Sequence, residues 1–181
     1  MAKTGRDVVS YALFLALAAN LAVFAWRGEL TEALESAAWL ALLLMFDLEC
    51  GRPEWLHAAR RHALDALRAV AIVAVVIAET AYVLDEDWLD AANAALWIAV
   101  VVLLESEARW PLWTARHRAV FKTIAGTLYL GLGVLVCAWL WRGDFFDAWD
   151  ATLWLAAFVL LERKALAKMA TVAAARRERL Q

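Results

Sequence analysis

Carboxylates and tryptophans recur along this chain at one fixed spacing, and together they could bind and guide a cation. Trp39, Trp97 and Trp154 are separated by 58 and 57 residues. The same offsets relate an acid seven residues before each tryptophan and another acid eight residues after it: Glu32, Asp90 and Asp147, then Asp47, Glu105 and Glu162. Rings of carboxylates select cations, and apolar constrictions can gate a pore. The pattern predicts an ion pathway if the three faces converge.

The elements that carry these residues are copies of one unit. Residues 26–49, 84–107 and 141–164 align without gaps, and this period indicates an internal repeat. We expect repeat units at approximately 1–55, 56–113 and 114–169, followed by a basic cytoplasmic tail at 170–181. The whole chain, 1–181, is expected to be a single transmembrane domain.

The composition is that of an integral membrane protein. Hydrophobic residues make up 65% of the 181 positions, with only 7 Gly and 2 Pro, which is far above the usage of soluble domains. Each unit contains two apolar runs, and each run reaches the roughly 20 residues of a span once its flanking polar turn is included. The runs are 8–25, 33–46, 69–84, 91–104, 123–141 and 151–161. These predict an all-α fold of six transmembrane helices, arranged as three tandem hairpins with pseudo-threefold symmetry.

The distribution of cations predicts the orientation and the partners. If the first span starts inside, 16 of the 18 Lys and Arg lie on the cytoplasmic side, and only Arg27 and Arg142 lie outside. We expect a multi-pass protein of the cell (inner) membrane with both termini in the cytoplasm. Its partners would be the lipid bilayer, anionic headgroups on the basic side, and another membrane protein or further copies of itself. No nucleic-acid partner is expected.

The repeated acids and tryptophans share one helical face, which two interpretations explain. On a wheel of 100° per residue, Glu32, Trp39 and Asp47 lie within one third of the circumference. Carboxylates within a span are costly in lipid and turn toward protein or water. The face then either lines a cation pathway with the tryptophans as its constriction, or it fills the core of a closed bundle.

The acids also have a purely structural explanation. Carboxylates in the first turn of a returning helix favour the positive end of its dipole, which would account for the outer set. Arginines close in sequence could neutralise the inner set, namely Arg52, Arg109 and Arg163.

Glu79 differs from these acids because it lies inside an outward-running helix and has no equivalent in the other units. It stands five residues before Leu84, about 7 Å from the outer end of the run. It is either a ligand for a proton or cation, or a carboxylate hydrated from outside.

Most of the remaining tryptophans are expected in aromatic belts at the membrane surfaces. The outer belt would contain Trp26, Trp88, Trp139, Trp141 and Trp149, and the inner belt Trp55, Trp110 and Trp113. Cys50 and Cys137 fall at opposite ends of spans, too far apart for a disulfide, so both are expected to be free thiols.

The sequence lacks the residues that several kinds of cofactor binding and catalysis require. His57, His62 and His117 all lie in the predicted inner linkers, where they cannot hold a haem within the bilayer. The HExxH, GxxxxGK[ST] and GxGxxG motifs are absent. We expect no enzyme, no cofactor and no metal site. Two classes of function remain: a small cation channel or transporter, or a non-catalytic scaffold or accessory subunit that packs against a partner or binds an apolar ligand such as a lipid, quinone or pigment.

Overall fold

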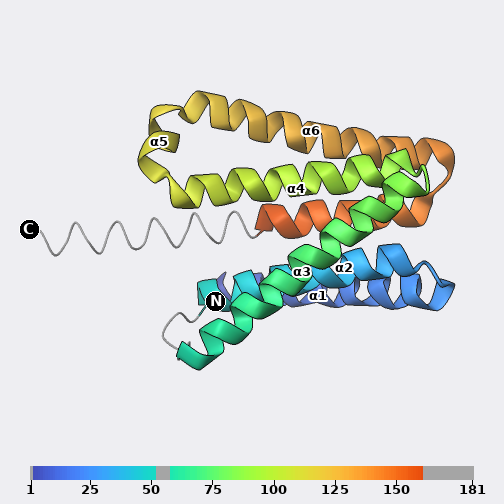
Figure 1. Cartoon of the computed structure of the whole chain (residues 1–181), viewed down its shortest axis with the longest axis horizontal. Coiled ribbons are helices and arrows are strands. Elements are labelled where there is room, and N and C mark those ends of the chain that lie inside the picture. The colour runs from blue at the N-terminus through green and yellow to red at the C-terminus, as the bar shows by residue number, and fades with distance from the viewer. Residues whose placement is uncertain (1, 52–57, 161–181) are drawn as a thin grey trace, which may run out of the picture. The chain divides into compact units, whose positions relative to one another are not determined.

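The computed structural model is helical throughout the part of the chain that it describes, residues 2–51 and 58–160 (Figure 1). Side chains are described for residues 8–45, 62–107, 110 and 112–160. The chain divides into two compact units. Unit 1 contains the residues up to Ala74 and those from Leu153 onward, and unit 2 runs from Val75 to Thr152.

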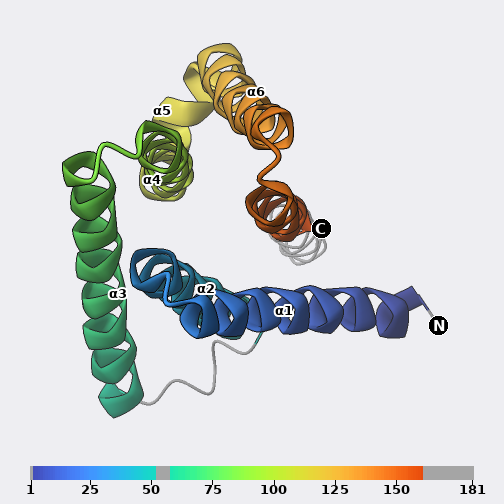
Figure 2. The ribbon, with the colours of Figure 1, turned by 90° about the vertical axis from the view of Figure 1, so that its right-hand side faces the viewer.

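Unit 1 is built on a helical hairpin. Helices α1 (Ala2–Arg27) and α2 (Leu30–Gly51) lie side by side and contact each other along their lengths (Figures 1 and 2). Their apolar side chains include Leu17 and Met45, each 2% exposed. The first part of α3 (Ala58–Leu84) and the described end of the last helical segment, 145–160, belong to the same unit.

Unit 2 is organised around α4 and α6. Helices α4 (Trp88–Arg109) and α6 (Arg118–Arg142) run side by side, and the short helix α5 (Pro111–Arg116) joins them at one end (Figure 1). A Cβ on Gly131 of α6 would lie 3.1 Å from Cδ1 of Leu96 on α4. Glycine at this position therefore allows the two helices to approach closely.

The three turns that the sequence predicts as outer turns share one backbone geometry. Gly28, Glu86 and Gly143 have positive φ angles of 80°, 60° and 88°. The residue after each donates its backbone N–H to the carbonyl five residues earlier, over 3.1, 2.9 and 2.9 Å: Glu29 to Phe24, Asp87 to Tyr82, and Asp144 to Trp139. This is the Schellman arrangement, in which a left-handed residue ends a helix.

The next helix starts at once. Glu29, Asp87 and Asp144 each accept a hydrogen bond at their backbone carbonyl from an alanine four residues on, over 3.0, 3.0 and 3.1 Å. The acid that completes the cap of one helix is thus the N-cap residue of the next, where a carboxylate favours the positive end of the helix dipole. The same geometry recurs at spacings of 58 and 57 residues.

Four described helices are long and apolar enough to cross a membrane, as expected for an integral membrane protein: Val8–Arg27, His62–Leu84, Trp88–Glu107 and Arg118–Arg142. Helix α2 has the length of a span with 22 residues, but Glu32 and Glu35 interrupt one end of its apolar run and Asp47 the other. The segment 145–160 is helical up to the limit of the described residues. The structure thus establishes four candidate spans where the sequence predicts six.

Helix α4 ends at Arg109, and Pro111 occupies the first position of α5, where its missing N–H costs nothing. One local expectation is wrong. Trp139 does not lie in an aromatic belt: it is 3% exposed and packs with Ala148 and Ala151. Among the other belt tryptophans with described side chains, all are more than half exposed: Trp26, Trp88, Trp110, Trp113, Trp141 and Trp149.

The left-handed glycines should be sensitive to a single methyl group. Gly28→Ala and Gly143→Ala should each lower the free energy of unfolding by about 1 kcal/mol or more, because an L-residue is strained at these φ angles. Unfolding in mixed micelles would measure this. Gly126→Ala is the matched control, since its Cβ would have no neighbour within 4 Å and its φ is not positive. An equal loss of stability in the control would contradict the prediction.

Candidate functional site

The three tryptophans proposed as a constriction are buried. Trp39, Trp97 and Trp154 are 7%, 4% and 7% exposed. Trp39 and Trp154 belong to unit 1, and Trp97 belongs to unit 2. Such low exposure agrees with the core interpretation of each tryptophan.

Trp39 is also fixed by a polar contact inside its helix. Its Nε1 donates a hydrogen bond of 3.1 Å to Oε1 of Glu35, four residues earlier. Glu35 is only 9% exposed, so this bond holds a buried carboxylate and a buried indole together. The hydrogen bond fixes the orientation of the indole ring relative to Glu35, an acid that is not among the predicted site residues.

The outer acids lie at the starts of returning helices. Glu32, Asp90 and Asp147 are all half-buried, and Glu32 and Asp90 fall in the first turns of α2 and α4. These positions suit the helix dipole, and they also keep the carboxylates within reach of water. Both interpretations of the outer set are therefore compatible with their positions.

The inner acids are described only in part. Glu105 is exposed near the end of α4, whereas the side chain of Asp47 and all of Glu162 lie outside the described residues. Across the described residues, no group of three or more His, Cys, Asp or Glu is placed to hold a metal ion. Cys137 is a free, exposed thiol, and the side chain of Cys50 is not described.

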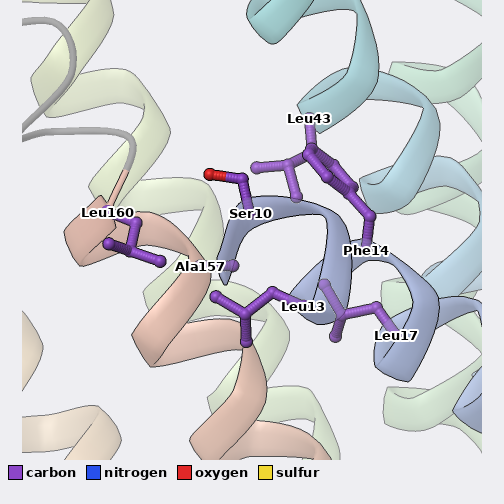
Figure 3. Close-up of a pocket in the computed structure, with 7 residues that line it drawn as sticks. All are labelled: Ser10, Leu13, Phe14, Leu17, Leu43, Ala157 and Leu160. Atoms are coloured by element: carbon purple, nitrogen blue, oxygen red, sulfur yellow. The ribbon is translucent and has the colours of Figure 1, made fainter. Parts of the chain in front are cut away.

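An apolar groove lies in unit 1 between α1, α2 and the last helical segment (Figure 3). Its walls are Leu13, Phe14, Leu17, Leu43, Ala157 and Leu160, and Ser10 is its one polar lining residue. The cavity has a volume of about 20 Å³, enough for a single water molecule. Pockets that enclose organic ligands are roughly 300 Å³ or larger, and this groove is much smaller.

Glu79 is the acid with the most unusual surroundings. It lies on α3 next to Ala78, which is completely buried, and one turn from the buried Val75 and Tyr82. Its Oε2 is shielded from solvent and has no hydrogen-bond partner among the described residues. Oδ1 of Asn93, on α4, is a second buried oxygen without a partner in that part of the chain. The hairpin of α3 and α4 thus buries two acceptor oxygens to which no described residue donates.

The charge around this hairpin is one-sided. Between Arg68 and Arg109 the sequence contains no Lys or Arg, while five acids lie within 69–104: Glu79, Asp85, Glu86, Asp87 and Asp90. The first and third hairpins differ, because each has a Trp-Arg-Gly sequence before its turn acid. In the first, Arg27 lies 3.8 Å from Glu29. Only the second hairpin lacks a cation at its outer turn.

Two of these features could have been recognised in the sequence. The second hairpin has Leu84, Asp85 and Glu86 where the first and third hairpins have Trp-Arg-Gly, and this replacement marks it as different. An aromatic residue five positions before each turn acid, Phe24, Tyr82 or Trp139, marks the buried end of each outgoing helix; these three are 4%, 4% and 3% exposed. The partnerless oxygens have no counterpart in a sequence pattern, because they depend on packing.

No protein-family model, curated protein or solved structure matches this chain.

The contact between Trp39 and Glu35 should contribute measurably to stability. Trp39→Phe removes the indole N–H donor to a buried carboxylate and should lower the free energy of unfolding by about 2 kcal/mol or more. Trp26→Phe, at a position that is 87% exposed, should change it by less than about 0.5 kcal/mol. The two variants would be compared by denaturant unfolding in the same detergent. Equal losses of unfolding free energy in the two variants would show that the hydrogen bond between Trp39 and Glu35 does not stabilise the protein.

Proposed function

We propose that this protein is a small channel or transporter for a cation, a proton included, and that Glu79 is the binding group within the membrane. One observation carries the proposal: Oε2 of Glu79 is buried in a candidate span without a hydrogen-bond partner among the described residues. An unpaired carboxylate in a medium of low polarity costs several kcal/mol. A proton or a cation removes that cost.

Helix α3 offers Glu79 no nearby counter-charge. The nearest Lys or Arg on α3 is Arg68, 11 residues away, or about 16 Å along the helix. Arg68 lies 3.7 Å from Asp65 instead. Ionisable residues inside membrane spans commonly mark pathways for ions and protons. The charge that balances Glu79 would therefore come from solution.

The outer turn of the second hairpin provides the approach in this proposal. Asp85 and Glu86 are exposed and Asp87 is half-buried, and no basic residue of the hairpin opposes them. A patch of one sign raises the local concentration of the opposite ion. In the full proposal, six spans form three hairpins around a pseudo-threefold axis, with Glu32, Asp90 and Asp147 around the outer mouth and Asp47, Glu105 and Glu162 inside. Both termini lie in the cytoplasm.

Removal of the charge at Glu79 should abolish transport. In proteoliposomes with separate gradients of protons, sodium and potassium, Glu79→Gln should reduce the flux of the transported ion at least about tenfold, since the amide cannot take up a proton and binds a cation weakly. Glu107→Gln, at an exposed carboxylate on α4, should keep the flux of the wild type. Wild-type flux in Glu79→Gln would rule out this role.

The outer acids should act through long-range attraction. The triple variant Glu32→Gln, Asp90→Asn, Asp147→Asn should reduce flux up to about tenfold at low ionic strength. The deficit should shrink when salt rises from about 10 mM to about 1 M, because the screening length falls from about 30 Å to about 3 Å. The measurement is the initial flux rate at both ionic strengths. A deficit that does not depend on salt would mean that these acids serve the structure instead.

The second candidate is a non-catalytic scaffold or accessory subunit. The burial of Trp39, Trp97 and Trp154 favours it, because tightly packed tryptophans suit a closed bundle. A folded wild-type protein that carries no flux of any of the three ions would support the scaffold. Such a scaffold would pack against a protein partner or bind an apolar ligand such as a lipid, quinone or pigment.

A further inference from the structure

The end of unit 2 that contains α5 presents large apolar side chains to its surroundings. Trp110, Leu112 and Trp113 are 58%, 88% and 54% exposed. Trp110 lies between α4 and α5, and Leu112 and Trp113 lie in α5. Exposed tryptophans at the end of a membrane span are characteristic of the headgroup region, where their rings contact both apolar and polar layers.

An aromatic contact joins α5 to the start of α6. The ring of Trp113 lies with its centroid 5.2 Å from that of His117 and 5.3 Å from that of Phe121, the latter nearly edge-on at 86°. Phe121 is 5% exposed and belongs to α6. Edge-to-face pairs at this distance are favourable. The contact packs α5 against the first turns of α6.

Three exposed cations follow the exposed tryptophans: Arg116, Arg118 and Lys122. None of them forms a salt bridge with another described residue. Arg27 and Arg68, in contrast, lie within 4 Å of Glu29 and Asp65. Within seven residues, this end of the chain therefore concentrates positive charge that its own described carboxylates do not neutralise.

We propose that α5 and the first turns of α6 form a binding surface for the phosphate headgroup of an anionic phospholipid. Its six residues are Trp110, Leu112, Trp113, Arg116, Arg118 and Lys122. The arginines donate paired hydrogen bonds suited to phosphate oxygens, and the tryptophans lie at the level of the headgroups and glycerol. The inference goes beyond the transport proposal and does not depend on it.

Lipid titration of the full-length protein tests the surface. In native mass spectrometry of the detergent-solubilised protein, phosphatidylglycerol should bind at least about tenfold more tightly than phosphatidylcholine with the same acyl chains, because each basic residue near an anionic surface contributes to binding. The triple variant Arg116→Gln, Arg118→Gln, Lys122→Gln should lose this preference and keep its affinity for phosphatidylcholine.

A matched variant removes the same number of charges elsewhere. Arg27→Gln, Arg68→Gln, Arg142→Gln should keep the preference for phosphatidylglycerol within about twofold of the wild type, and an equal loss in this control would overturn the proposal. Binding of soluble glycerol phosphate as tight as that of the lipid would also overturn it, in favour of a site for free phosphate. Unfolding curves establish that both variants are folded.

Salt provides a test that needs no variant. The preference of the wild type for phosphatidylglycerol should fall several-fold between about 0.01 and 1 M salt, because screening weakens the attraction between exposed charges. Micelles of the two lipid compositions, with binding followed by tryptophan fluorescence, suit this salt series. A preference that salt leaves unchanged would exclude the charged surface as its cause.

Discussion

The hairpins of this protein depend on a backbone constraint at three turns. A residue with positive φ, Gly28, Glu86 or Gly143, ends one helix, and the acid that follows it begins the next. With only two or three residues between the two helices, the returning helix starts immediately, and its first turn follows closely on the end of the outgoing one. The position of every acid and tryptophan on the returning helix follows from that start, because helical spacing sets each later residue.

Glu86 shows that the constraint matters more than the residue type. Gly28 and Gly143 adopt the left-handed region at little cost, whereas Glu86 adopts the same region as an L-residue with φ of 60°. A glycine there would be easier to accommodate. The second hairpin instead places a further carboxylate at its outer turn, next to Asp85 and Asp87, and has no arginine there. This choice of residues is costly for the backbone and increases the negative charge near Glu79.

Much of the local structure could be predicted from the sequence. The outgoing helix, the acidic turn and the returning helix follow from apolar runs bounded by Gly28 and Gly143, and the burial of Trp39, Trp97 and Trp154 follows from their place on a face unsuited to lipid. Trp139 could not be assigned correctly in the same way. Its position near the end of a run is equally suited to a belt or to a core, and only its contacts with Ala148 and Ala151 decide between them.

Comparison of equivalent positions in the three hairpins also separates residues with a structural role from residues that could bind a ligand. Phe24, Tyr82 and Trp139 occupy equivalent positions in the three hairpins, and all three are buried. The three central tryptophans are likewise equivalent and buried. Residues that recur in all three hairpins therefore serve the packing of each hairpin. Glu79 occurs only in the second hairpin, and the equivalent positions of the first and third hairpins hold Leu21 and Val136. A carboxylate at that level of a span is costly in an apolar medium, so its presence sets the second hairpin apart from the other two. The acids of the outer and inner sets recur in every hairpin, whereas Glu79 occurs in the second hairpin alone.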